Sequence, residues 1–531
     1  MATRDNSPSP QADHERRPLL GSRSTSRAHS VSRTSISSKS DLSSSIFWRL
    51  APIIVLGSLE TSITTTTGLD ILRGAACKIW YLVNDPASIP EDGQIPDHMC
   101  HLGQRNSPEA YYAMYFTVIT FLTGLCHVIT SSAIAKFANT WGRRPVFLML
   151  NVLDVIGTWM FAFSVVSNSS IALYTLACSV MLSLLAGPLM AILVTTLMIT
   201  DTTDSTNRTY VLSRVQGALW LGLAPGFVIG GYLSVATSRA TPLFIAAGIS
   251  VFRLIYNFLL IRETFSAPEI IASQEEDAEE TQLRSQEGRL LRILGWVTAP
   301  FAPLQRLIPR VDPTSNRRNP RLLLLAIGVG VYSLGSSHLS QLLLVYSANQ
   351  LYFTSKDTGI FLTLFDCGKV FVLFLVVPPV LSLGRSLYSP QESRLDTLAP
   401  EETDPSAAVH ASPTPNRDKV ASHFDVHLVI FSWILQAAVI VILPFAPTKA
   451  AYTAIACTWT IGAGSVPAMD SAVVASISRL DTGSVLAAMQ MVKAIAEVAS
   501  PLILGNLNAW SAGVFPTLTF FITAVCTHTC D

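Results

Sequence analysis

The 531-residue chain is half hydrophobic and only 14% charged, whereas about 25% of the residues of a typical soluble domain are charged. Its 36 basic residues balance its 36 acidic ones, so the chain has no net positive charge that would attract nucleic acid. The mean hydropathy of +0.42 makes soluble dinucleotide-binding folds poor candidates. Twelve membrane-crossing helices of about 20 apolar residues would occupy roughly 240 residues. The composition therefore predicts an all-α polytopic membrane protein.

Residues 1–46 form a polar segment rich in Ser, Arg and Pro. Such a composition buries too little apolar surface to offset chain entropy, so we predict a disordered cytosolic tail. Within it, Glu15 followed by Leu19 and Leu20 resembles the acidic dileucine signal that vesicle-coat adaptors recognise. We therefore expect sorting adaptors as partners and a vacuolar or endosomal membrane as the location. The plasma membrane is the alternative if this short motif is a chance match.

Twelve apolar windows follow the tail, in two sets of six. They lie at residues 47–69, 112–134, 146–166, 171–197, 211–235, 242–262, 322–345, 358–382, 426–446, 450–475, 484–506 and 512–529. This order predicts two six-helix bundles, 47–262 and 322–531, joined by a cytosolic loop at 263–321. Apolar residues among the arginines of 284–310 indicate an interfacial helix, and the Pro- and Ser-rich loop 384–424 is expected to be disordered.

Basic residues are concentrated in the loops on the same side of the membrane as the tail. Because short cytosolic loops carry excess Lys and Arg, both termini are predicted to be cytosolic. The sequon at Asn168 then lies in an outer loop and is the candidate glycosylation site, whereas the sequon at Asn207 faces the cytosol. Cys77 and Cys100 share the first outer loop, where an oxidising compartment would allow a disulfide between them.

The junction between the second and third spans reads AKFANTWGRRP. It resembles the signature loop of the major facilitator superfamily, G-x-x-x-D-x-x-G-R-[RK], because Gly142, Arg143 and Arg144 match it. Ala135 replaces the first Gly, and Asn139 replaces the Asp that helps to lock the cytosolic gate in the family. The resemblance implies a gate here in which Asn139 forms hydrogen bonds but supplies no charge. A merely basic cytosolic loop is the alternative interpretation.

The fifth span contains the segment GLAPGFVIGG. It resembles the antiporter motif of the same superfamily, G-x-x-x-G-P-x-x-G-G, with Gly222, Gly226, Gly230 and Gly231 in register and the Pro displaced to Pro225. The resemblance implies exchange of substrate against protons. Glycines four residues apart also let a second helix approach closely, so helix packing alone is the alternative.

Three further stretches, 201–208, 261–264 and 462–468, resemble fungal members of the superfamily. The resemblance extends over roughly residues 47–529. It implies the superfamily fold, in which twelve transmembrane helices form two six-helix pseudo-repeats.

Charged side chains at membrane depth are costly and are therefore candidates for function. Glu60 lies near the middle of the first span, with no basic residue within one turn and a run of hydroxyl residues after it. Because desolvation favours the neutral form of an unpaired carboxylate, Glu60 is the leading proton-coupling candidate, and Asp154 in the third span is the second. His338 in the seventh span is another candidate, for which core packing is the alternative.

Two spans carry an acid and a base at helical spacing, Asp366 with Lys369 and Lys493 with Glu497. Such neighbours face each other on one helix side and more often neutralise each other than perform chemistry, although Asp366 is kept as a proton-coupling candidate. Arg253 lies within the sixth span.

Together these features predict a secondary active transporter of a small organic molecule, coupled to protons and working by alternating access in efflux or vacuolar transport. A passive facilitator and a non-transporting receptor or sensor of the same fold are the alternatives. No phosphate loop, nucleophile elbow or metal-ligand spacing occurs in the sequence, so we expect no catalytic residues, cofactor or metal site. The expected partners are a small-molecule substrate, protons and membrane lipid, but not nucleic acid.

Overall fold

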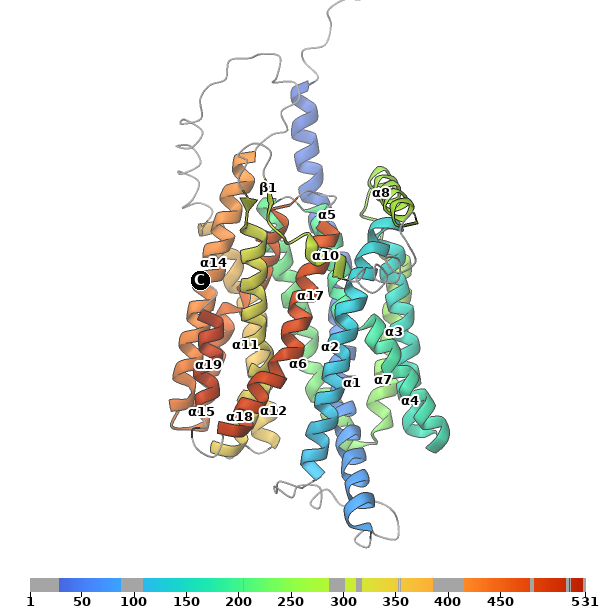
Figure 1. Cartoon of the computed structure of the whole chain (residues 1–531), viewed down its shortest axis with the longest axis vertical. Helices are drawn as coiled ribbons and strands as arrows, with labels where there is room; N and C mark the ends of the chain where they lie inside the picture. The colour runs from blue at the N-terminus through green and yellow to red at the C-terminus, as the bar shows by residue number, and fades with distance from the viewer. Residues whose placement is uncertain are drawn as a thin grey trace, which may run out of the picture.

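The computed structural model describes residues 28–86, 108–167, 169–203, 205–285, 301–311, 318–351, 353, 355–384, 415–477, 482–511, 515 and 517–528. Long helices run along the longest axis of the molecule and stand side by side (Figure 1). In the first half of the chain they are α1 (Ala28–Asn84), α2 (Pro108–Thr140), α3 (Arg143–Val166), α4 (Ser169–Ala186), α5 (Pro188–Thr202), α6 (Ser205–Ala236) and α7 (Ala240–Leu260).

The second half of the chain repeats this pattern with more interruptions. The two halves are connected by α8 (Ala267–Ser285), α10 (Ala302–Gln305) and the antiparallel strands β1 (Arg310–Val311) and β2 (Arg318–Asn319). The α-helices that follow are α11 (Arg321–Gln350), α12 (Ser355–Phe371), α14 (Pro415–Ile442), α15 (Lys449–Trp459), α16 (Ser465–Val474), α17 (Thr482–Ser500), α18 (Asn506–Ser511) and α19 (Leu518–His528). Between them lie two π-helical turns, η4 (Val372–Val376) and η8 (Pro501–Gly505), and two 3₁₀ turns, η6 (Leu443–Phe445) and η7 (Thr460–Gly464).

All twelve predicted windows contain helix. Within the described residues, nine helices are long and apolar enough to cross a membrane, and the last, α19, is shorter at 11 residues. Several windows are broken where the sequence disfavours a regular α-helix. The fourth window, for example, is divided into α4 and α5 at Gly187, because Pro188 suits a first helical position and not a helix interior. The predicted all-α polytopic fold is confirmed.

The elements outside the membrane windows differ from the prediction. Helix α1 begins at Ala28, so residues 28–46 are helical where disorder was predicted, because adding a residue to an existing helix costs far less than nucleating a new one. For the same reason α14 begins at Pro415, inside the loop predicted to be disordered. Of the predicted interfacial helix, residues 286–300 lie outside the described residues, and α10 follows them.

The glycines of the fifth span bring α6 close to α1. A Cβ atom added at Gly222 would overlap Ser58, one at Gly226 would overlap Ser62, and one at Gly230 would lie 3.1 Å from the backbone of Ile63. Helix α6 therefore rests on the α1 backbone through a face that has no side chains.

Helices of the two halves of the chain also pack against each other. Helix α2 lies beside α17 (Figure 1). A Cβ atom added at Gly124 of α2 would overlap the side chain of Val498. Helix α6 contacts α12 and η4, where a Cβ on Gly217 would lie 2.7 Å from the ring of Phe374. The two halves therefore touch closely at two places, α2 with α17 and α6 with α12 and η4.

Candidate transport and proton site

Three charged side chains from three different helices meet inside the first half. Arg253 of α7 places Nη2 3.2 Å from Oε2 of Glu60 on α1, and the same nitrogen bonds Asp154 of α3. Thr158 donates a hydrogen bond of 2.9 Å to the other Glu60 oxygen. Glu60 is 3% exposed and Arg253 8%. One guanidinium thus serves two carboxylates at membrane depth.

This charged cluster, Glu60, Asp154 and Arg253, corrects one sequence-based expectation. Glu60 is not unpaired, because its base comes from a helix almost two hundred positions further along the chain. Helical spacing reveals partners only on the same helix, and therefore could not indicate this one. Gly57, about one turn before Glu60, makes the contact possible, since a Cβ at that position would overlap the Arg253 guanidinium.

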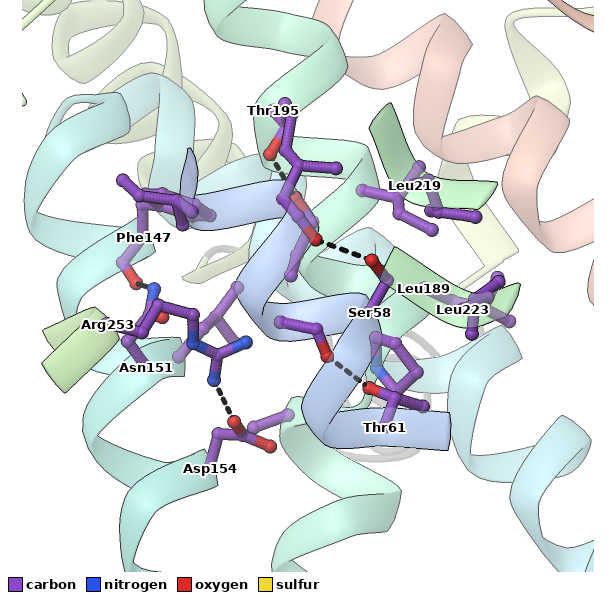
Figure 2. Close-up of a pocket in the computed structure, with 18 residues that line it drawn as sticks. Ser58, Thr61, Phe147, Asn151, Asp154, Leu189, Thr195, Leu219, Leu223 and Arg253 are labelled. Carbon is purple, nitrogen blue, oxygen red and sulfur yellow. Dashed lines mark hydrogen bonds and ion pairs between the residues drawn. The ribbon is translucent and has the colours of Figure 1, made fainter. Parts of the chain in front are cut away.

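A cavity of about 230 Å³ lies against the charged cluster. Figure 2 shows Arg253 pointing towards Asp154, with Asn151 beside it and Ser58 and Thr61 on the neighbouring helix. The Ser58 and Thr61 hydroxyls donate to carbonyl groups of their own helix, which satisfies them away from water.

A second, central cavity of about 400 Å³ is lined by both halves of the chain. Ile54, Leu189 and Thr195 line it as well as the smaller cavity, so the two adjoin. Its polar lining consists of Thr195, Thr196, Gln216, Ser333, Ser336, Ser337, Ser465, Asp470, Gln490, Lys493 and Glu497. Its aromatic lining consists of Trp220, Tyr332 and Trp433.

The candidates of the second half take different positions. Lys369 donates to Asp366 at 3.0 Å, so this predicted pair is confirmed. Lys493 interacts electrostatically with Glu497 on its own helix, but its hydrogen bond of 3.1 Å goes to Asp470 of α16. His338 is buried in α11 and is not among the residues that line the central cavity.

The signature loop is held by residues outside the matched motif. Arg143 is almost fully buried; its Nε lies 3.0 Å from Asp201, and its Nη1 donates to the Asn139 side chain at 2.5 Å. Asn139 in turn lies against Gly483 at the start of α17. The neutral Asn139 thus keeps the hydrogen bond to Arg143, while Asp201 supplies the negative charge.

The side chain of Glu263 caps the N-terminus of α3. Its two carboxylate oxygens accept the backbone N–H groups of Arg143 at 2.9 Å and Arg144 at 3.0 Å, which no carbonyl within the helix can reach. A negative charge is favoured at this end of a helix dipole. The roles of Asp201 and Glu263 were missed, although both lie in stretches that resemble fungal members of the superfamily.

We expect Gly142→Ala to lower the free energy of unfolding by about 1–3 kcal/mol. Gly142 has a φ of 96°, and a Cβ there would lie 2.6 Å from the Glu263 carboxylate. Thermal unfolding of the purified protein measures the effect. Gly248→Ala is the matched control, because a Cβ at Gly248 meets no atom within 4 Å. Equal melting temperatures for the two variants would contradict the role given to Gly142.

Some candidates lie outside the described residues, namely Glu15, Leu19, Leu20, Cys100 and Asn168. Cys77 takes part in a disulfide, and its pairing with Cys100 stays a prediction, as do the sorting signal and the glycosylation site.

Comparison with known proteins agrees with this architecture. Residues 105–387 match the family described as Major Facilitator Superfamily. A relative of the chain is the major facilitator-type transporter psiT1 of Psilocybe cyanescens. The two are 24% identical over 443 residues, which cover 81% of this chain and 92% of the relative. This chain is also 30% identical over 152 residues, 29% of the chain and 36% of the relative, to the class B tetracycline resistance protein of Escherichia coli.

Solved structures share the fold at low identity. The human organic anion transporter MFSD10 superimposes with a TM-score of 0.63 at 15% identity, over 91% of this chain and 98% of that one. The proton:xylose symporter XylE superimposes with a TM-score of 0.58 at 14% identity, over 93% and 95% of the two chains. With more than half of its length matched by the family, this chain belongs to the major facilitator superfamily and is a multi-pass membrane transporter.

Proposed function

We propose that the protein is a proton-coupled secondary active transporter that moves a small organic molecule by alternating access. The observation that carries the proposal is the charged cluster, in which two carboxylates share one arginine beside a cavity that adjoins the central cavity. The six-helix units 47–262 and 322–531 are the two parts that would rock against each other around the central cavity.

The charge balance of the cluster explains how a proton would act. With Glu60 and Asp154 both ionised, Arg253 cancels only one of two negative charges. A net charge at membrane depth is costly, and one bound proton removes it. Proton binding therefore favours whichever conformation buries the cluster more deeply, which is how a ligand shifts a two-state equilibrium.

Two kinds of similarity support the proposed coupling and direction. The proton:xylose symporter XylE and the Escherichia coli fucose:proton symporter FucP share the fold with this chain. The glycine face of α6 resembles the antiporter motif, and a tetracycline resistance protein is among the relatives. We therefore propose export of the substrate from the cytosol, in exchange for protons.

The signature loop is the proposed cytosolic gate. Asn139 of the first half accepts a hydrogen bond from Arg143 and lies against Gly483 of the second half. A second contact joins the two halves, since Thr209 of α6 donates a hydrogen bond of 2.7 Å to Asp425 of α14. Opening towards the cytosol would require both contacts to separate.

Compound-induced proton movement tests this function even while the substrate is unidentified. The full chain is reconstituted into liposomes loaded with the pH-sensitive dye pyranine, and small organic molecules are added one at a time. We expect at least one compound to change the internal pH, and protein-free liposomes are the control. Compound flux without proton movement would indicate a passive facilitator, and absence of any flux would favour a receptor.

We propose a vacuolar or endosomal location, directed by Glu15, Leu19 and Leu20. Replacing Leu19 and Leu20 with Ala should move a fluorescent fusion to the plasma membrane, because adaptors would no longer bind the tail. Fluorescence microscopy of wild-type and variant fusions measures the shift. An unchanged distribution would show that the motif is a chance match.

A further inference from the structure

We propose that Glu497 binds the charged group of the substrate and that the substrate is an aromatic or amphiphilic organic cation. This inference rests on the proposed transport function, because it names the class of molecule that the central cavity would carry.

The charged side chains that line the central cavity do not cancel one another. The ammonium of Lys493 is bound to Asp470 and also interacts electrostatically with Glu497, so one cation faces two carboxylates. Its side chain lines both the central cavity and a side cavity of about 460 Å³ that lies between α2, α4 and α17. Asp470, Lys493 and Glu497 together carry one net negative charge when ionised. A cationic ligand would cancel that charge.

Aromatic rings also line the central cavity. The rings of Tyr332 and Trp433 stack with centroids 4.8 Å apart and an interplanar angle of 14°, and both line the central cavity. Aromatic faces attract cations through the quadrupole of the ring. Within this protein a lining ring already binds an ammonium group, since Lys369 places Nζ 3.4 Å from the centroid of Trp220. Asp366 neutralises that lysine, so it adds no repulsion to a second cation.

The same lining disfavours a negatively charged substrate. An anionic substrate would have to bind Lys493 in competition with Asp470 while it approached Glu497, and like charges brought together in a desolvated site repel strongly. The remaining polar lining, including Ser333, Ser337 and Gln490, is neutral and forms hydrogen bonds with either charge type. A volume of about 400 Å³ lies within the range of small-molecule sites.

Equilibrium binding of two ions of similar shape and opposite charge tests the proposal. Radiolabelled tetraphenylphosphonium, a cation, and tetraphenylborate, an anion, are each measured against the full-length protein in nanodiscs without any pH gradient. We expect the wild type to bind the cation more tightly than the anion. Glu497→Gln should weaken cation binding by about tenfold or more, because removal of one member of a desolvated charge pair is costly.

Two further variants separate recognition from folding. Glu497→Asp keeps the charge and should retain most of the affinity, whereas Glu275→Gln removes an exposed carboxylate of α8 and should bind as the wild type does. Melting temperatures of all variants in nanodiscs show whether the fold is intact. Unchanged cation binding by folded Glu497→Gln would overturn the proposal, as would tighter binding of the anion or no binding of the cation by the wild type.

The same measurements separate this proposal from the proposed function. Binding without a gradient does not depend on proton coupling, so cation recognition through Glu497 would stand even if the pyranine assay detected no proton movement. Conversely, if only anionic compounds caused proton movement, the proposed proton-coupled transport would stand and the proposed cationic substrate would be wrong.

Discussion

Arg253→Met should abolish proton-coupled transport and lower the free energy of unfolding by about 3–5 kcal/mol, the usual cost of breaking a buried ion pair. Arg253 is the base bonded to both Glu60 and Asp154. Its loss leaves two carboxylates facing each other without their cation in a buried site. Methionine fills similar space without the charge, so the effect reports on charge more than on packing.

Thermal unfolding in detergent and compound-induced proton flux measure the two consequences. Arg262→Met is the control, since Arg262 is exposed just beyond the end of α7. Adding Glu60→Gln and Asp154→Asn to Arg253→Met should restore stability while flux stays absent, because no uncompensated charge then remains. If the triple variant were as unstable as the single one, Arg253 would act through packing and not through the two carboxylates.

Glu60→Gln should eliminate gradient-driven transport while leaving exchange of substrate across the membrane intact. Glutamine keeps the size of glutamate, and its single amide oxygen can still accept the hydrogen bond from Thr158, but it neither binds nor releases a proton. The cluster then has one acid and one base and is permanently neutral, as it is in the protonated wild type. We therefore expect the two halves still to alternate between their conformations, but without coupling of substrate movement to protons.

The measurement compares uptake driven by a pH gradient with exchange of labelled substrate at equal pH, in the same proteoliposomes. Asp154→Asn is the matched variant, because it removes the other carboxylate bound to Arg253. Equal losses in both variants would mean that the proton is shared by the pair. Gradient-driven uptake at the wild-type level in Glu60→Gln would show that Glu60 is structural, and Asp154 would become the coupling residue.

The sequence by itself determined the class of fold. Runs of about 20 apolar residues must become helices in a bilayer, because no water is present to satisfy the backbone groups. All twelve windows therefore contain helix, and the signature loop is at the predicted junction between α2 and α3. The pair of Asp366 and Lys369 was also predictable, because both members lie on one turn of one helix.

Only the tertiary structure decided which residues from different helices meet. The ion-pair partner of Glu60 comes from α7, and the carboxylate that is hydrogen-bonded to Lys493 comes from α16. In both cases the geometry depends on how each helix is rotated and how closely it approaches the next. The contact of Arg253 with Glu60, for example, requires that Gly57 has no side chain. Helical periodicity fixes the faces of a single helix, but packing between helices chooses which faces touch. For this reason the sequence identified the charged residues in the membrane, and the fold determined that Arg253 pairs with Glu60 and that Lys493 bonds Asp470 of another helix.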